Sequence, residues 1–134
     1  MDASVHYVPK VPFAEVVVAH LKQKYPRLLG LKIYANKEPG LPVVIADLND
    51  AGIGEPGSKY DEDVISSGVI NYLKDRGAVE VTLPLRDRNG EIAAALKTRM
   101  KAFPGETQST AVARAATIRK AVEAQTEAME NITK

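Results

Sequence analysis

The chain has 134 residues, a formal net charge of +1, 45% hydrophobic residues and no cysteine. This length predicts one domain over residues 1–134, with residues 1–11 as a mobile tail. Balanced charge and few aromatic residues disfavour nucleic-acid binding, and the absence of cysteine excludes disulfides and thiol chemistry. Two histidines leave little material for a metal site, so we expect no metal and no cofactor.

The first predicted element is a helix that begins near Pro12. Apolar residues recur at helical spacing, and the helix should end by Tyr25 because the residue before a proline disfavours helical angles. The apolar face consists of Phe13, Val16, Val17 and Leu21.

Two strands are predicted next, at Leu28–Asn36 and Leu41–Leu48, joined by a turn at residues 37–40. The first strand alternates, which places side chains on two faces of a sheet. One face should carry Leu29, Leu31, Ile33 and Ala35, and the other Lys32, Tyr34 and Asn36.

The middle of the chain is predicted as a loop at Asn49–Gly57, a short helix at Asp61–Ser66 and a third strand at Val69–Lys74. The loop matches the dinucleotide pattern G-x-G-x-x-G. Glu55 would repel a phosphate and Pro56 lacks an amide N–H, so we interpret this segment as a connector.

A hairpin is predicted around Asn89-Gly90, the strongest two-residue hairpin signature. Type I′ angles at both residues would place Arg88 opposite Glu91, Thr82 opposite Lys97 and Glu80 opposite Arg99. The other face then pairs Leu85 with Ala94, Leu83 with Leu96 and Val81 with Thr98.

A final helix is predicted at Thr107–Ile132. The order of elements favours an α+β domain with a five-stranded antiparallel sheet. We expect the N- and C-terminal helices on one face and the short middle helix or loop on the other. Burial is expected for Phe13, Val17, Leu21, Val81, Leu83, Leu85, Leu96, Ile118 and Val122.

One face of the hairpin is polar, and two interpretations are open: a solvated sheet surface, or the floor of a pocket. Lys97 and Arg99 carry donors that suit a carboxylate, and Tyr60 could form a lid. From the third strand, either Tyr72 and Lys74 or Asn71 should face the pocket. The candidate ligand-binding residues are Tyr34, Asn36, Tyr60, Tyr72, Thr82, Lys97 and Arg99, and no catalytic residue is predicted.

Three stretches carry a family resemblance: KYPRLLGLKIYA, VVIADLNDAGIGEPGSKYDEDVISSG and EVTLPLRDRNGEIAAALKTRM. Together with the closing helix they resemble the PAS-like, single-Cache type of small-molecule sensor domain, within the profilin-like group. The resemblance covers about residues 12–132. It implies an extracytoplasmic domain that binds a small organic ligand on the sheet face below the middle helix and signals through its terminal helices.

We therefore expect a non-enzymatic sensor domain that binds a small anionic metabolite, such as a carboxylate. The alternative is an interaction module of the profilin or roadblock type that dimerises without a ligand. The helix at Thr107–Ile132 is longer than one sheet face requires, so its end is expected either to form a homodimer through the terminal helices or to mark the attachment of a downstream segment, the alternative being a frayed C-terminus. The N-terminal sequence lacks a signal-peptide pattern, so an extracytoplasmic location requires an absent leader, and a cytoplasmic location stays open.

Overall fold

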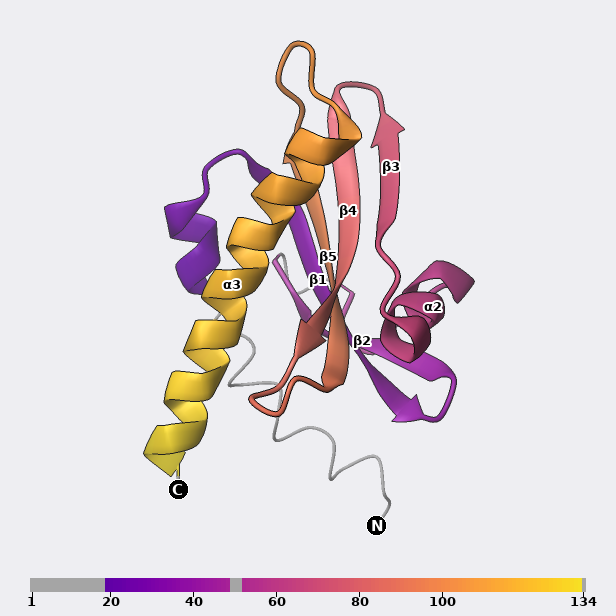
Figure 1. The fold of residues 1–134 in the computed structure, drawn as a ribbon, viewed down its shortest axis with the longest axis vertical. Helices are drawn as coiled ribbons and strands as arrows, with labels where there is room; N and C mark the ends of the chain where they lie inside the picture. Colours follow the sequence, from indigo (N-terminus) through magenta and orange to yellow (C-terminus); the bar gives the residue numbers. More distant parts are fainter. Residues whose placement is uncertain (1–18, 49–51, 134) are drawn as a thin grey trace.

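Five antiparallel strands form the centre of the protein, in the order β2-β1-β5-β4-β3 (Figure 1). The computed structural model describes residues 19–48 and 52–133, with side chains through residue 125, so the predicted tail at 1–11 lies outside the described residues. Helical residues 19–24 precede the sheet, and this helix ends before Tyr25, as predicted. The elements that follow are β1 (Leu28–Glu38), β2 (Leu41–Asp47), α2 (Lys59–Ser67), β3 (Asn71–Asp75), β4 (Ala78–Arg86), β5 (Ile92–Lys101) and α3 (Gln108–Thr133).

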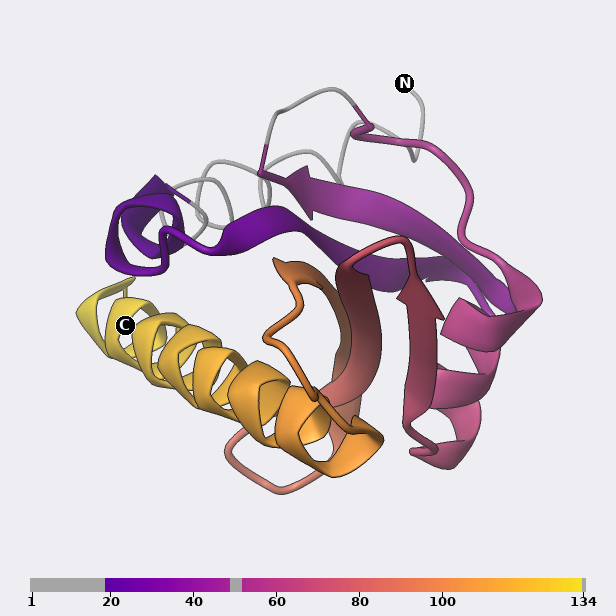
Figure 2. The same ribbon diagram turned by 90° about the horizontal axis from the view of Figure 1, so that it is seen from above.

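The helices lie on the two faces as predicted, with α3 on one face and α2 on the other (Figure 2). The α+β prediction is therefore confirmed. The main core joins the α3 face of the sheet to α3 and to Leu21. Seven of the nine residues expected to be buried are buried, and Phe13 and Val17 lie outside the described residues. None of the described helices is both long and apolar enough to span a bilayer.

The β4–β5 hairpin has the predicted strand register but a different turn. Glu80 pairs with Arg99, Thr82 with Lys97 and Leu83 with Leu96, as predicted. The two-residue Asn89-Gly90 turn is wrong, because the ladder stops at the pairing of Arg86 with Ile92.

Asp87 explains the different turn. Its carboxylate accepts hydrogen bonds from the N–H groups of Asn89 (2.9 Å) and Glu91 (3.0 Å). Gly90 has φ 82°, whereas Asn89 does not have positive φ. An Asp at the first position and a glycine at the fourth are typical of a type I turn, so this side chain favours a longer loop than the type I′ turn.

Two details of the strands differ from the prediction. A register shift between Leu28 and Gly30 leaves Leu29 49% exposed, and Leu28 is buried in the core instead. An inserted residue reverses the alternation of faces, which the sequence pattern does not reveal. The third strand begins at Asn71 rather than Val69, because Gly68 ends α2 in a left-handed conformation (φ 74°) two residues after the predicted helix end.

The chain itself covers one edge of the sheet. The described part of the predicted loop at Asn49–Gly57 runs back along β2 through a bridge between Val43 and Pro56. Main-chain bonds join Val44 N–H to Glu55 O (2.9 Å) and Gly57 N–H to Pro42 O (2.8 Å). The whole G-x-G-x-x-G match, at residues 52–57, lies among the described residues, where it covers this edge of the sheet and leads into α2.

Candidate functional site

The α2 helix sits on the polar face of the sheet and is fixed at both ends. At its N-terminus, the Asp61 N–H donates to the Ser58 hydroxyl (3.3 Å) and the Ser58 N–H donates to the Asp61 carboxylate (2.7 Å), which forms a capping box. At its C-terminus, the Gly68 N–H donates to Val64 O at 3.0 Å. This geometry fixes the direction in which the Asp61 side chain points.

Asp61 reaches the sheet and forms an ion pair with Lys97. The Lys97 ammonium lies 3.0 Å from Asp61 Oδ1 and 3.3 Å from Oδ2, and the Asp61 side chain is only 1% exposed. The ammonium also lies 5.0 Å from the centre of the Tyr34 ring and 3.5 Å from its hydroxyl. The positive charge of Lys97 on β5 is thus already balanced by Asp61 of α2.

The electrostatics of this pair favour its charged form. Burial acts to lower the pKa of Lys97, but the hydrogen bond to Asp61 and the nearby Tyr34 oxygen outweigh it, so the pKa is raised. Burial also raises the pKa of Tyr34, and the Lys97 charge only partly offsets this. At neutral pH Lys97 is therefore an ammonium and Tyr34 a neutral phenol.

A small apolar cluster accompanies the ion pair between α2 and the sheet. It consists of Tyr34, Val44, Val64 and Ala95, all nearly or fully buried. The small side chain of Ala95 leaves room above the sheet, and α2 occupies that room. The space that the sequence suggested for a ligand is thus taken up by the protein's own helix.

Thr82 stands out on the same face. It pairs directly with Lys97 across the hairpin and is fully buried. Its hydroxyl has no hydrogen-bond partner among the described residues, which is unusual because burying an unpaired hydroxyl is costly.

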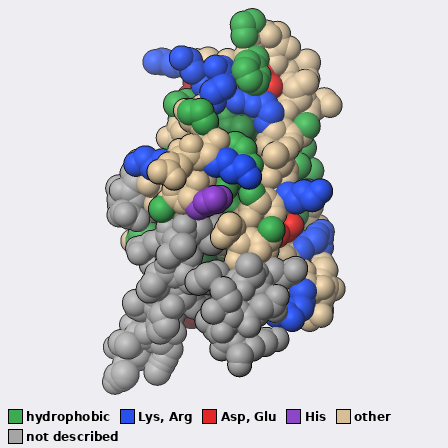
Figure 3. All heavy atoms as spheres, turned by 90° about the vertical axis from the view of Figure 1, so that its left-hand side faces the viewer, with side chains coloured by type: hydrophobic (Ala, Val, Ile, Leu, Met, Phe, Trp, Pro, Cys, Tyr) green, Lys and Arg blue, Asp and Glu red, His purple; other side chains and the backbone are tan. Residues whose placement is uncertain are grey.

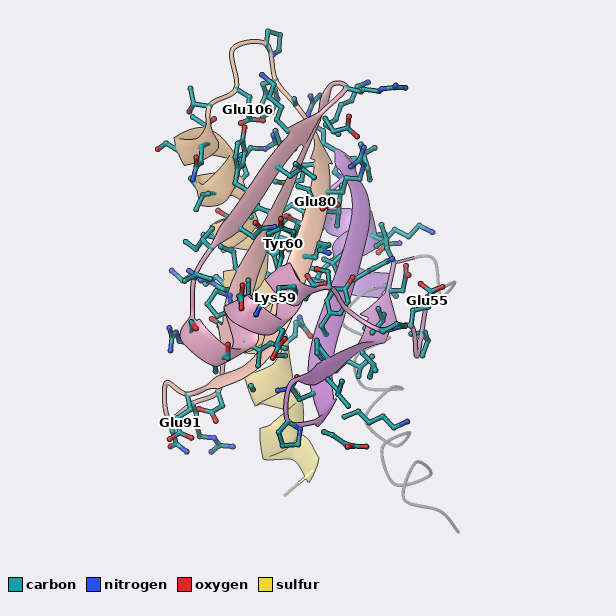
Figure 4. All side chains as sticks on the ribbon, turned by 90° about the vertical axis from the view of Figure 1, so that its right-hand side faces the viewer. Glu55, Lys59, Tyr60, Glu80, Glu91 and Glu106 are labelled. Atoms are coloured by element: carbon teal, nitrogen blue, oxygen red, sulfur yellow. The ribbon has the colours of Figure 1, made fainter. Side chains whose placement is uncertain are left out.

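Arg99 lies towards the open end of this face. Its guanidinium lies 3.9 Å from a Glu80 carboxylate oxygen and 3.8 Å from one of Asp75, and its side chain is 39% exposed. Contacts of this length between exposed groups are weak. Figure 4 views the face with α2 in front of the sheet and Glu80 on β4 above the helix.

The structure brings together three of the seven candidate residues, namely Tyr34, Thr82 and Lys97. Arg99 lies two residues along β5 from Lys97 on the same face. Asn36 is exposed near the end of β1. Tyr60 is 63% exposed, so the predicted lid contact comes from its neighbour Asp61 instead.

The placement of Tyr72 in the pocket is wrong. Tyr72 pairs with Val81 and packs against the α3-side core, whereas Asn71 pairs with Thr82 and shares the polar face. Directly opposite residues in an antiparallel pair point to the same side of the sheet. Since the sequence left the register open between these alternatives, pairing with β4 decides it in favour of Asn71.

The sequence analysis missed Asp61 and Gly57. A Cβ at Gly57 would lie 2.9 Å from the Tyr34 ring and 3.1 Å from the Asp61 carboxylate, so glycine permits the close approach of this segment. The sequence does contain a pattern that indicates the position of Asp61, because Ser58 and Asp61 have the spacing of a capping box at the start of a helix. No group of three or more potential metal-ligating side chains occurs in the part of the chain that the structure describes.

Comparison with known proteins identifies the fold. No protein-family model and no curated protein matches the sequence. Solved structures do match, among them the GAF domain of A. aeolicus nlh2, with 7% identity and a TM-score of 0.61 over 83% of this chain and 81% of that one. The GAF domain of Thermosynechococcus elongatus PixJ, in its blue-light absorbing form, matches with 10% identity and a TM-score of 0.60 over 93% and 87%.

A third similar structure is the C-terminal domain of the E. coli transcriptional regulator KdgR. It shares 15% identity with a TM-score of 0.56, covering 87% of this chain and 97% of that domain. These likenesses confirm that the chain has a fold similar to that of GAF domains, a PAS-like arrangement of an antiparallel sheet and helices. They add no support for the Cache family or the profilin-like group in particular.

Proposed function

We propose that this protein is a non-enzymatic sensor domain that binds a small organic anion between α2 and the polar face of the sheet. The observation that carries the proposal is the buried, unpartnered Thr82 hydroxyl beside the Lys97–Asp61 pair. A ligand oxygen would satisfy this hydroxyl, and Lys97 lies directly across the hairpin from it. The GAF-type fold of known sensor domains supports the same assignment.

A carboxylate is the ligand class that these residues suit. It would compete with Asp61 for the Lys97 ammonium, while Arg99, held only by long contacts, supplies a second cation. Because Val64 of α2 and Ala95 of β5 are both completely buried where the helix meets the sheet, such a ligand must displace α2. Ligand occupancy and the position of α2 are then coupled, as a sensor requires.

The test is a thermal-shift screen with mono- and dicarboxylates of two to six carbons, each beside its amide. A specific ligand raises the melting temperature through mass action. We expect at least one carboxylate to act and its amide to fail. Lys97→Met should abolish the response, and the control Lys101→Met, on the exposed end of β5, should retain it.

A second test uses the competition between the ligand carboxylate and Asp61 for the Lys97 ammonium. Since Asp61→Asn leaves Lys97 without its carboxylate, this variant should bind the same ligand more tightly, even if it is less stable alone. If no carboxylate shifts any of these variants, or if Asp61→Asn binds more weakly, the proposed site is wrong.

The extracytoplasmic location is a second part of the proposal, and it rests on the resemblance to single-Cache domains. Fractionation of cells that express the complete native gene tests it. Recovery of the protein with the cytoplasmic fraction would contradict it.

Dimerisation through the terminal helices is a further candidate function, because α3 is long for one face of a five-stranded sheet. It spans 26 residues, and among its described side chains the buried ones run from Ala111 to Val122. A chain ending at Gln125 tests this. It retains Glu123, which accepts a hydrogen bond from the Arg86 N–H at 2.8 Å. Unchanged sedimentation mass after this truncation would rule out a dimer through the helix end.

A further inference from the structure

A separate cavity lies on the other face of the sheet, where the segment before β1, the end of β5 and the first half of α3 meet. Its volume is about 300 Å³, at the lower end of the range for small-molecule sites. Much of its wall is apolar, formed by Tyr25, Leu28, Met100, Phe103 and Ile118. We call it the Arg27 cavity.

Two arginines line this cavity, and both lie against the Phe103 ring. The Arg27 guanidinium lies 4.2 Å from the centre of the Phe103 ring, and that of Arg114 lies 4.3 Å from it. Cation–π contacts of this kind fix the ring, so one wall of the cavity is formed in advance. Figure 3 faces this side of the molecule, and blue basic side chains border green hydrophobic ones in its upper part.

The two arginines differ in how their charge is balanced. Arg114 forms an ion pair with Glu106, whose side chain is 1% exposed, and donates to Lys101 O at 3.1 Å. Arg27 donates to main-chain oxygens, of Lys101 at 3.4 Å and Ala102 at 3.2 Å. Among the described residues no carboxylate pairs with Arg27, so within this part of the chain its positive charge at the cavity is not balanced.

Glu106 forms its ion pair with Arg114 and not with Arg27. Burial acts to raise the pKa of Glu106, but hydrogen bonds from Thr110 and from the Phe103 N–H, together with Arg114, outweigh it and lower the pKa. The carboxylate thus stays ionised and fixed on Arg114 at neutral pH.

From this arrangement we infer that the Arg27 cavity binds a small amphipathic monocarboxylate, with its carboxylate on Arg27 and an aromatic or short aliphatic body against Leu28, Met100 and Phe103. A guanidinium whose N–H groups are not all hydrogen-bonded binds a carboxylate strongly, and burial of the ligand's apolar part against the apolar walls is favourable. The cavity opens on the α3 side of the sheet, away from Lys97. The inference therefore stands independently of the site under α2.

The probe is phenylacetate, compared with neutral phenylacetamide of nearly the same shape. Amide resonances of 15N-labelled protein report where each compound binds. We expect saturable shifts around Arg27, Met100 and Phe103 with phenylacetate, and roughly tenfold weaker binding of the amide. Resonances around Lys97 and Asp61 should not move.

Two variants separate charge from volume. Arg27→Met removes the cation but keeps a long side chain over Phe103, and should weaken phenylacetate binding about tenfold while leaving the amide unaffected. Thr117→Leu adds bulk at the cavity wall from an exposed position on α3 and should weaken both compounds. Arg119→Met, on α3 but outside the lining, is the matched control and should change neither.

Thr117→Leu tests the cavity even if Arg27→Met fails to fold, because Thr117 is an exposed residue of α3 and its substitution should leave the fold intact. No saturable shift with phenylacetate, or equal binding of both compounds by the wild type, would overturn the inference. Binding that Thr117→Leu leaves intact would do the same. Shifts centred on Lys97 instead would assign the carboxylate to the α2 site.

Discussion

The two faces of the sheet are held by different kinds of interaction. On the α3 face, seventeen buried residues form one apolar cluster that includes four from α3. On the α2 face, four buried residues form a small cluster beside the Lys97–Asp61 ion pair. Each face is closed by a helix, but only the α3 face is closed mainly by apolar contact.

This difference indicates which helix can move at lower cost. Apolar burial contributes in proportion to area and depends little on any single contact, so the α3 face should stay closed whenever the protein is folded. An ion pair can be exchanged for an equivalent one with a ligand. The α2 face is thus the part of the molecule where binding and conformational change can be coupled at modest cost.

The largest effect should come from the α3-face core. Leu96→Ala removes a fully buried side chain, and we expect a loss of about 3 kcal/mol in the free energy of unfolding. Urea denaturation followed by circular dichroism measures it. The corresponding change on the other face, Val64→Ala, should cost about half as much, because it removes two carbons instead of three and a short surface helix can settle onto the smaller side chain. An equal or larger loss at Val64 would contradict the contrast between the faces.

The ion pair comes next. Asp61→Asn leaves the partly buried Lys97 ammonium without its charge partner, which should cost about 2 kcal/mol. Replacing both residues, as in Asp61→Leu with Lys97→Met, should restore part of this loss, because no charge is then left unpaired. Urea midpoints of the single and double variants test this.

The control for this prediction lies on the same helix. Lys59 and Asp63 form an exposed i,i+4 pair at 3.6 Å, and Lys59→Ala should cost less than about 0.5 kcal/mol. If Lys59→Ala and Asp61→Asn lower the free energy of unfolding equally, burial does not distinguish the two pairs. Asp61 then does not hold α2 on the sheet.

The α3 face could be predicted from the sequence almost completely. Alternation in Val81, Leu83 and Leu85, together with the helical spacing of Ile118 and Val122, identified buried side chains without any tertiary information. The register of the β4–β5 ladder also followed from the pattern, although the turn did not. Asp87 bonds to the loop backbone, and such local competition is not visible in the Asn-Gly signature.

For the α2 face, the polar side chains and the middle helix that covers them could be predicted, but the contacts between helix and sheet could not. Lys97 and Thr82 were correctly placed opposite one another, but the partner of Lys97 comes from Asp61, thirty-six residues earlier in the chain. Nothing in the alternation of a strand specifies which residue of the covering helix will contact it. The sequence likewise left open whether Tyr72 or Asn71 faces this side, since the orientation depends on pairing with β4, and the inclusion of Tyr72 among the candidate residues is wrong.

A smaller effect is expected at the approach to α2. Gly57→Ala would place a methyl group 2.9 Å from the Tyr34 ring, so the segment before α2 must shift, at a cost of about 1 kcal/mol. The matched control is Gly30→Ala, where a Cβ meets only the Arg99 Cβ at an ordinary 3.6 Å. Thermal melts of both variants test the contrast, and a Gly30→Ala protein that is less stable than Gly57→Ala would refute it.

The smallest effect should be the response to pH, and it separates the faces by sign. The pKa of Glu106, on the α3 side, lies below its ordinary value of 4.5, so its contribution is present above that pH and is lost as the pH falls through the folded-state pKa. The pKa of Lys97, on the α2 side, lies above its ordinary 10.5, so its contribution is present below that pH and is lost as the pH rises through the folded-state pKa.

Stability should therefore be nearly flat in the neutral range as far as these two groups are concerned, and should fall at both extremes. Glu106→Gln should flatten the acid limb alone, because the variant has no carboxylate whose protonation differs between the folded and unfolded states. Lys97→Met should change the alkaline limb alone: it removes the part due to Lys97, and the part due to the raised pKa of Tyr34 stays. Urea midpoints measured from pH 3 to pH 11 test both variants. If Glu106→Gln also changed the alkaline limb, the charges on the two faces would be coupled. The two faces would then not respond to pH independently.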